Sequence, residues 1–246
     1  MAILFISDLH IDAGRPDITG QFIEFLKDEA SDAEALYILG DLFESWVGDD
    51  APDSGQDEAL DAIRSLTAHG VPCFVMHGNR DFLLAQQFCG MSGAALLPDP
   101  VIVTLYGERV LVMHVDALCT DDRAYQRLRA TVRDPDWQRQ FLALPVESRR
   151  ALAGAARVGS QAHTAALEYA IADVNPSSVE TALRAAGTAT LLHGHTHRPA
   201  IHELQVDGRP CTRIVLGDWY DQGSLLRWDR HGPELVSLSR EKPPTF

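Results

Sequence analysis

The stretch MAILFISDLH, residues 1–10, joins an apolar run to two side chains that commonly bind metals. The run Ile3–Ile6 predicts a buried strand, and Asp8 and His10 follow it two residues apart. Because residues i and i+2 of an extended chain project to the same side, we expect the carboxylate and the imidazole to lie together. Open α/β sheets carry their sites at the carboxyl ends of strands. The stretch therefore predicts an α/β sheet with a candidate site at its edge, although a capping Asp beside an unrelated His explains these ten residues equally well.

Length and composition indicate a globular protein with a well-buried core. The chain has 246 residues, of which 46% are hydrophobic and 23% are charged, as is usual for globular domains. No apolar run reaches the roughly 18 to 20 residues that cross a bilayer, and the first residues lack the basic region of a signal peptide. The four cysteines have no CxxC spacing, which favours reduced thiols. We therefore expect a cytoplasmic protein without a leader.

Charge is distributed unevenly along the chain. The net charge is −14, which argues against general nucleic-acid binding. Residues 123–157, however, hold eight arginines, no lysine and three acidic residues, so this segment carries +5 and the remainder −19. A cationic segment with apolar side chains suggests contact with an anionic ligand or a membrane surface. An arginine-rich face that is simply solvated is an even alternative.

The apolar pattern predicts strands and helices in alternation. The expected strands are Leu36–Leu39, Val71–Met76, Thr190–Leu192 and a hairpin of Val101–Leu105 with Arg109–His114. Apolar residues at helical spacing lie at 22–26 and 60–66, and Gly70 is placed to end the second of these helices. Ser177 and Glu180 have the spacing of a capping box that opens a further helix, which Gly187 would end. This alternation predicts a sheet covered by helices.

Residues 121–172 differ from the rest of the chain in pattern. They are rich in Ala and Arg and have helical periodicity, interrupted by Pro135, Pro145 and Gly154. We interpret this stretch as a helical subdomain inserted into a single domain that spans residues 1–246.

Five predicted strands end in side chains of the metal-ligand type. They are Asp8 with His10, Asp41, Asn79, His114, and His195 with His197. A core has no reason to finish every strand in a polar coordinating group, so chance is a poor explanation for all five. The mixed carboxylate, amide and imidazole set, without thiolate, suits Mn, Fe or Zn and not a structural zinc site of the cysteine type.

This order of motifs, D-x-H, G-D, G-N, H and G-H-x-H, resembles that of the calcineurin-like metallophosphoesterase superfamily. The flanking residues are similar to those of one family within it, the UDP-2,3-diacylglucosamine diphosphatases of lipid A biosynthesis. The similar blocks are Gly40–Glu44, Gly48–Asp50, Gly78–Leu83, Leu118–Asp122, His193–Pro199 and Leu216–Trp219. The resemblance runs from residue 1 to about residue 228 and is weakest between about 135 and 170.

The resemblance implies a four-layer α/β/β/α sandwich with a helical lid inserted at about 121–172, and a site for two Mn²⁺ ions or other divalent metals. The implied ligands form two sets with one bridging carboxylate: Asp8, His10 and His197; Asn79, His114 and His195; and Asp41 between them. Two ions about 3.5 to 4 Å apart lower the pKa of a shared water and clamp phosphoryl oxygens during in-line displacement. The implied catalytic residues are Asp41, Asn79, Arg80 and His195.

Arg80 narrows the expected substrate class. Most members of the superfamily have His after the Gly-Asn pair, where it is placed to assist the leaving group, whereas an arginine cannot give up a proton at physiological pH. A site without that acid suits a leaving group that is stable as an anion, such as a phosphate. We infer a diphosphate substrate whose charge Arg80 neutralises. The alternative is that Arg80 only pairs with Asp81.

The inserted segment fits the same substrate. In the family it shelters the acyl chains of a glycolipid, and the apolar residues available here are Leu128, Trp137, Phe141, Leu142, Leu144, Leu152 and Leu167. Packing of the insertion onto the core explains any one of them equally well. The resemblance places the substrate contacts at Asn79, Arg80, Asp122, Ser160, Thr164, Leu167 and His195.

Three positions depart from the family pattern. The family usually has Asn and Lys where this chain has Thr164 and Leu167, so one cationic contact to the substrate is lost unless an arginine replaces it. The family also has Gly after the His114 ligand, where this chain has Val115. If that glycine adopts a positive φ, a β-branched residue is strained there. Either the loop is rebuilt or the site is looser.

We therefore expect hydrolysis of UDP-2,3-diacylglucosamine to UMP and 2,3-diacylglucosamine 1-phosphate. The lipid substrate implies a monomer attached peripherally, through the lid, to the cytoplasmic face of the inner membrane of a Gram-negative bacterium. Two alternatives stay open. One is a related phosphoesterase for a soluble nucleotide diphosphate, which Val115 and Leu167 favour. The other is a non-catalytic scaffold with the same fold, although a scaffold has no need of seven ligands.

Overall fold

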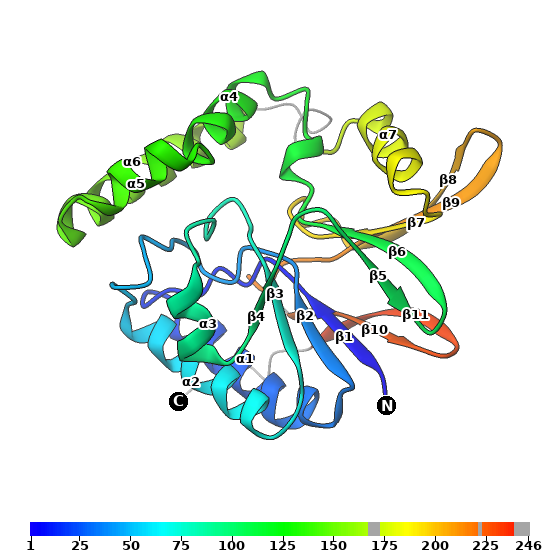
Figure 1. Cartoon of the computed structure of the whole chain (residues 1–246), viewed down its shortest axis with the longest axis horizontal. Coiled ribbons are helices and arrows are strands. Elements are labelled where there is room, and N and C mark those ends of the chain that lie inside the picture. The colour runs from blue at the N-terminus through cyan, green and yellow to red at the C-terminus, as the bar shows by residue number, and fades with distance from the viewer. Residues whose placement is uncertain (167–172, 221–222, 239–246) are drawn as a thin grey trace, which may run out of the picture.

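A computed structural model describes residues 1–166, 173–220 and 223–238, with the backbone alone for residues 161–166. Two β-sheets pack face to face, and helices lie on their outer faces (Figure 1). The strand orders are β11-β10-β1-β2-β3-β4 in the first sheet and β5-β6-β7-β9-β8 in the second. The expected four-layer sandwich is confirmed.

The first sheet is built around β1 (Ile3–Ile6). Its other strands are β2 (Ala35–Ile38), β3 (Cys73–Met76), β4 (Ala95–Leu97), β10 (Gly223–Asp229) and β11 (Gly232–Leu238). Strands β1 to β4 run parallel, whereas β10 and β11 are antiparallel additions beside β1. Because β1, β2 and β3 run parallel, the loops that follow them leave from one edge of the sheet.

Three helices cover the outer face of the first sheet: α1 (Pro16–Asp28), α2 (Ser54–Ala68) and α3 (Gln86–Ser92). The short 3₁₀ helix η1 (Ala30–Asp32) follows α1. The apolar stripe of α1 is buried, and Phe22 and Phe25 meet the fully buried Trp219 edge to face. Gly70, with φ of +96°, follows the end of α2 as expected.

The second sheet contains the predicted hairpin and the last ligand-bearing strand. Its strands are β5 (Val101–Leu105), β6 (Glu108–Met113), β7 (Thr190–His193), β8 (Ala200–Val206) and β9 (Arg209–Val215). Strands β6, β7 and β9 are parallel neighbours. The two sheets bury a shared apolar layer that includes Phe5, Leu39, Met76, Val112 and Leu192. Because the two sheets pack on each other through this layer, the ends of β1 and β7 lie on the same side of the sandwich.

Helix α7 (Pro176–Ala186) covers the second sheet. The predicted capping box at Ser177 and Glu180 is wrong, because the N-cap is Asn175, whose side-chain oxygen accepts from the Ser178 N–H at 3.2 Å. Pro176 occupies the first helical position, where its fixed φ suits the helix and its missing N–H costs nothing. Gly187 ends the helix in the left-handed conformation, as predicted.

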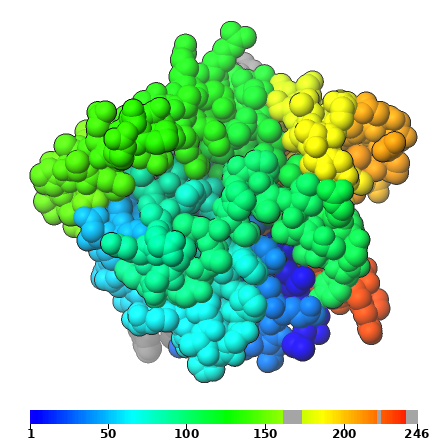
Figure 2. Space-filling model, viewed as in Figure 1, coloured from blue at the N-terminus to red at the C-terminus, as the bar shows by residue number. Residues whose placement is uncertain are grey.

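Between β6 and α7 the chain forms the 3₁₀ helix η2 (Asp116–Leu118) and then α4 (Arg123–Val132), α5 (Pro135–Leu142) and α6 (Val146–Ala166). The last three, called the lid helices below, lie over the edge at which β1, β2 and β3 end (Figure 1). In Figure 2 they rest, in green, on the N-terminal elements in blue and cyan. The predicted break at Gly154 is wrong: α6 continues through it, since one exposed glycine costs a helix only about 1 kcal/mol.

Arg149 fastens the start of α6 to the body of the protein. Its side chain is almost fully buried and donates to the carbonyl of Val47 at 2.7 Å, to the carbonyl of Leu144 at 3.1 Å and to the carboxylate of Asp50 at 2.8 Å. Across the part of the chain that the structure describes, no helix is both long and apolar enough to cross a membrane.

Candidate metal centre

The seven side chains that the sequence marks as metal ligands converge at one end of the sandwich. Asp8 and His10 follow β1, Asp41 follows β2 and Asn79 follows β3. His114 follows β6, and His195 and His197 follow β7. Neighbouring members of this group, called the ligand cluster below, lie within 2.9 to 3.8 Å of one another.

The backbone brings these side chains together by a different route from the one predicted. Asp8 and His10 have φ of 56° and 53°, so the chain is left-handed there and not an extension of β1. Asp41, His195 and His197 also have positive φ. Such conformations cost non-glycine residues about 1 to 3 kcal/mol each and persist where the surroundings fix them. Here the N–H groups of Asp8 and His10 donate to the carbonyls of Gly40 and Asp41 at 3.1 and 3.0 Å.

The glycines of the motifs are required by close packing in the cluster. A Cβ at Gly78 would collide with the carboxylate and backbone of Asp41. A Cβ at Gly194 would collide with Ser7 and Asp8. The G-N and G-H motifs therefore let one strand-end loop approach the carboxylates of another.

The first ligand set surrounds Asp8. His197 Nε2 lies 3.3 Å from Asp8 Oδ1 and 3.5 Å from His10 Nε2. Burial opposes ionisation of Asp8, but His197 and the other histidines outweigh that effect and lower its pKa. Burial also favours neutral His197, yet Asp8 and Asp218 raise its pKa to about 10. A cluster that holds a proton this firmly attracts cations, and metal binding would displace the proton.

The second ligand set surrounds the side-chain oxygen of Asn79. His114 Nε2 lies 3.0 Å and His195 Nδ1 2.9 Å from this oxygen. Burial, together with the proximity of His114, lowers the pKa of His195 to about 4. His195 is thus neutral near pH 7 and carries a lone pair for a metal ion.

Asp41 lies between the two sets. Its Oδ2 is 3.8 Å from His10 Nε2 in the first set, and its Oδ1 is 3.8 Å from His114 Nε2 in the second. The N–H of Arg80 donates to Oδ1 at 2.8 Å and fixes the carboxylate in this position. Each oxygen of one buried carboxylate therefore faces a different group of ligands.

Three histidines are oriented through the nitrogen that faces away from the cluster. His114 Nδ1 lies 2.9 Å from the carbonyl of Leu39, His10 Nδ1 lies 3.0 Å from Glu44, and His197 Nδ1 lies 3.0 Å from Asp218. The contacts of His114 and His197 fix their tautomers, and all three contacts leave Nε2 facing the ligand cluster. In addition, Asp8 Oδ1 is buried and makes no well-directed hydrogen bond among the described residues, although His197 Nε2 lies 3.3 Å away. The donor set fits divalent cations of the Mn, Fe or Zn type.

The sequence did not single out Glu44 and Asp218, although both lie in the blocks that resemble the family. A signal for Glu44 was available: it is an acid in the apolar run Leu42 to Val47, where a solvated role is improbable. Asp218 had the signal that marks Asp41, because it follows an apolar run, Ile214–Leu216, and a glycine.

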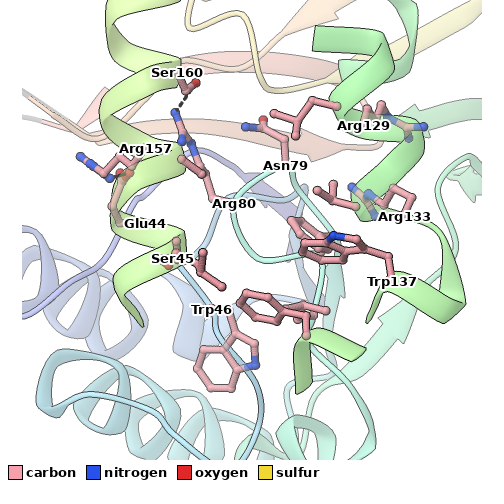
Figure 3. Close-up of a pocket in the computed structure, with 18 of the residues that line it drawn as sticks. Glu44, Ser45, Trp46, Asn79, Arg80, Arg129, Arg133, Trp137, Arg157 and Ser160 are labelled. Carbon is pink, nitrogen blue, oxygen red and sulfur yellow. Dashed lines mark hydrogen bonds and ion pairs between the residues drawn. The ribbon is translucent and has the colours of Figure 1, made fainter. Parts of the chain in front are cut away.

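Arg80 does not use Asp81 as its partner. The buried carboxylate of Asp81 accepts from the N–H groups of Leu42 and Gly78 at 2.8 and 2.7 Å, and so joins the loops that carry Asp41 and Asn79. The Arg80 guanidinium instead reaches Ser160 on α6, with 3.4 Å between Nη2 and Oγ (Figure 3). Its charge thus points to the space between the ligand cluster and the lid helices.

Comparison with known proteins agrees with this geometry. Residues 1–199 match the family model described as calcineurin-like phosphoesterase. The chain belongs to the calcineurin-like phosphoesterase family. An archaeal phosphodiesterase of known structure has the same fold, with a TM-score of 0.50, 14% identity, and coverage of 97% of this chain and 100% of its own.

Two curated relatives are similar over almost the full chain of this phosphoesterase. A protein of Stenotrophomonas maltophilia (strain R551-3) is 51% identical over 248 residues, which covers 98% of this chain and 100% of the relative. A protein of Xanthomonas axonopodis pv. citri (strain 306) is 51% identical over 246 residues, covering 97% and 100%. Both relatives are named UDP-2,3-diacylglucosamine hydrolase.

The phosphoesterase has a cavity of about 560 Å³ between its lid helices and the loops after β2 and β3 (Figure 3). Its walls include the lid residues Leu128, Trp137, Phe141, Leu144 and Leu152. Leu142, which the sequence grouped with them, is exposed and is not part of the wall, because its position on α5 faces away from the cavity. Leu167 lies outside the described residues. The cavity is also lined by four arginines, Arg80, Arg129, Arg133 and Arg157. Arg80 lies where the cavity meets the ligand cluster.

The remaining expected substrate contacts lie at a second, smaller cavity of about 280 Å³. Asp122, Ser160 and His195 line it. Asp122 is also the N-cap of α4, accepting from the Tyr125 N–H at 2.9 Å. The side chain of Thr164 lies outside the described residues.

Val115 keeps the backbone conformation that a glycine would adopt. Its φ is +76° and its ψ is 5°, so the alternative of a rebuilt loop does not apply. Its side chain is fully buried in the apolar layer between α7 and the second sheet. The strain of about 1 to 3 kcal/mol is comparable with the roughly 1.5 to 3 kcal/mol gained by burying a valine. The two effects offset each other, which explains how the loop carries Val.

Proposed function

We propose that this phosphoesterase hydrolyses UDP-2,3-diacylglucosamine to UMP and 2,3-diacylglucosamine 1-phosphate. The observation that carries the proposal is the continuity of the two cavities. Asn79, Arg80 and Ser160 line both the apolar cavity and the one at the ligand cluster. A substrate with a phosphorylated head and an apolar tail fits such a combined space, and the names of the two relatives agree with it.

We propose further that Asp8, His10 and His197 hold one divalent ion, that the set around Asn79 holds the other, and that Asp41 bridges them. Bound there, two ions such as Mn²⁺ would make hydroxide available near neutral pH and would neutralise charge on the phosphoryl oxygens. Asp41 fixes the spacing of the two ligand sets, and Asn79 and His195 would present their lone pairs to the ion of the second set, beside the reacting phosphate. Arg80 stabilises the anionic leaving group without transferring a proton.

The remaining predicted residues indicate where the sugar and the acyl chains of the substrate would bind. Asp122, Ser160, Thr164 and Leu167 are proposed to lie along the sugar and its substituents. The apolar side chains of the lid helices shelter the acyl chains. In this proposal residues 1–246 form one domain, and residues 121–172 are its lid.

The acyl chains are expected to dominate substrate selection. Each buried CH₂ group contributes about 0.8 kcal/mol, so about five of them favour the acylated substrate by about 10³-fold in kcat/KM. The measurement is UMP release, with Mn²⁺ present, from UDP-2,3-diacylglucosamine and from UDP-glucose, beside a chromogenic phosphodiester. Equal release from UDP-glucose would support the soluble-substrate alternative, and no turnover of any of the three would support the scaffold.

We also propose that the protein acts as a monomer on the cytoplasmic side of the inner membrane, attached through the lid. The support is a group of exposed apolar side chains on the lid helices and their connections: Leu128, Leu142, Leu144, Leu152 and Val158, of which the last is 67% exposed. Arginines are interspersed with them. Apolar side chains among cationic ones favour contact with an anionic bilayer surface.

Flotation with vesicles of anionic phospholipid tests this attachment. The unaltered protein is expected to float with the vesicles at low salt, and the double variant Leu152→Ser, Val158→Ser to bind at least about tenfold more weakly, because each lost apolar contact is worth about 1.5 kcal/mol or more. Ile201→Ser is the matched control, since Ile201 is exposed on β8 and not on the lid helices. An unaltered protein that stays with the solvent, or a control that behaves like the double variant, would refute the attachment.

A further inference from the structure

We propose that Glu44 links the metal centre to the lid, by positioning His10 with one carboxylate oxygen while Arg157 of α6 holds the other. Glu44 is thus a positioning residue that acts through His10. The inference rests on the proposed metal site, and it concerns how that site and the lid helices influence each other.

The contact with His10 is short and enclosed. Glu44 Oε2 lies 3.0 Å from His10 Nδ1, and the Glu44 side chain is only 6% exposed. The ring of Tyr220 stacks on that of His10, with 5.2 Å between centroids and 6° between planes. The Tyr220 hydroxyl lies 3.5 Å from the same carboxylate oxygen. Glu44 and Tyr220 together therefore confine the ring of His10, leaving Nε2 toward Asp41 and His197.

The contact with the lid uses the other oxygen of the same carboxylate. The Arg157 guanidinium pairs with Glu44 Oε1, and Figure 3 shows the two side chains side by side where α6 meets the cavity. A buried carboxylate needs such a partner, because an unpaired one is costly. The lid helix thus supplies the counter-charge for the group that orients a metal ligand.

The other oriented histidines differ in this respect. His197 is held by Asp218, which lies after β9, and His114 is held by the backbone of Leu39. Within the described ranges, neither Asp218 nor the backbone of Leu39 contacts the lid helices. Among the residues that hold these three histidines, Glu44 is therefore the one through which movement of α6 changes the orientation of a metal ligand.

Linkage makes the effect reciprocal: if α6 favours metal binding through Glu44, metal binding must favour the docked α6 equally. Two measurements on metal-free protein therefore apply, and neither needs substrate. One is the Mn²⁺ dissociation constant from titration calorimetry. The other is amide hydrogen exchange of residues 146–160 with and without Mn²⁺.

Glu44→Gln is expected to weaken Mn²⁺ binding by about 10- to 100-fold, the usual effect of losing a partner that orients a metal-binding histidine. It should also abolish the Mn²⁺-dependent slowing of exchange in α6. Arg157→Met should weaken Mn²⁺ binding less, and in the Glu44→Gln background it should add nothing, because Arg157 acts through Glu44. Glu44→Asp, which keeps the charge, should recover part of the affinity.

Asp50→Asn is the matched control. It removes the carboxylate that pairs with Arg149 on the same helix, without contact to a metal ligand. Mn²⁺ affinity should be unchanged, and Mn²⁺ should still slow exchange in α6. Loss of affinity in Asp50→Asn equal to that in Glu44→Gln, or additive losses in the double variant of Glu44 and Arg157, would overturn the proposal. A failure of the proposed hydrolysis would leave these measurements intact.

Discussion

Asp41→Ala is expected to lower kcat for UMP release by about 10³-fold or more. Removing one electrostatic contact to a transition state typically costs about 10²- to 10³-fold, and this change removes the carboxylate whose two oxygens face the two ligand sets at 3.8 Å each. Both ions would lose a ligand and their fixed spacing. The measurement is turnover of UDP-2,3-diacylglucosamine over a range of Mn²⁺ concentrations.

The fold should survive this substitution. Asp41 lies in the loop after β2, and the loop is held independently by the Asp81 carboxylate through the Leu42 N–H. Circular dichroism and the thermal midpoint of the metal-free variant measure whether the fold is retained. Asp50→Ala, at an exposed carboxylate remote from the cluster, is the control and should retain turnover. Near-parental turnover in Asp41→Ala would contradict the bridging role.

Arg80→Met is expected to lower kcat/KM for the diphosphate by about 10²-fold or more, the size of effect seen when a charged contact to a developing anion is lost. Arg80 faces the junction of the two cavities, and among the described residues its guanidinium reaches Ser160 and no carboxylate. Methionine keeps much of the apolar stem and removes the charge. The backbone N–H that holds Asp41 is unaffected.

The pH profile separates charge neutralisation from proton donation by Arg80. If Arg80 only neutralises charge, Arg80→Met should lower the rate evenly across pH, and Arg80→Lys should recover part of it. Ser160→Ala is the control for the Arg80–Ser160 contact and should have a much smaller effect. A variant that loses activity only on the alkaline side would show that Arg80 serves the proton transfer, and an Arg80→Met enzyme with unchanged kcat/KM would remove it from the site.

Much of this architecture follows from local pattern. Apolar runs of four to six residues located the strands that carry the ligands, because a buried parallel strand has few other ways to be encoded. The positions of the ligands in the chain were readable for the same reason. Their backbone conformation was not: the left-handed φ at Asp8 and His10 depends on carbonyls of the neighbouring loop, which are remote in sequence.

The errors have similar causes. Ser177 and Glu180 have the spacing of a capping box, but Pro176 sets the helix start and gives the cap to Asn175. Gly154 is a helix breaker by propensity alone, and α6 tolerates it. Glu44 shows the limit most clearly, because its partners His10, Arg157 and Tyr220 come from three distant segments. No local pattern encodes such a junction.

The lid helices leave the body of the protein after β6 and return before α7, and neither sheet contains a strand from the described part of this stretch. A change in length or sequence there leaves every strand pairing in place. The sequence of the lid helices can consequently change during evolution, and with it the acyl chains that are accepted, while the ligand cluster is inherited unchanged. Transplanting this excursion between homologues would exchange tail preference as one cassette, provided that the recipient keeps an acid at position 44 to meet the incoming arginine.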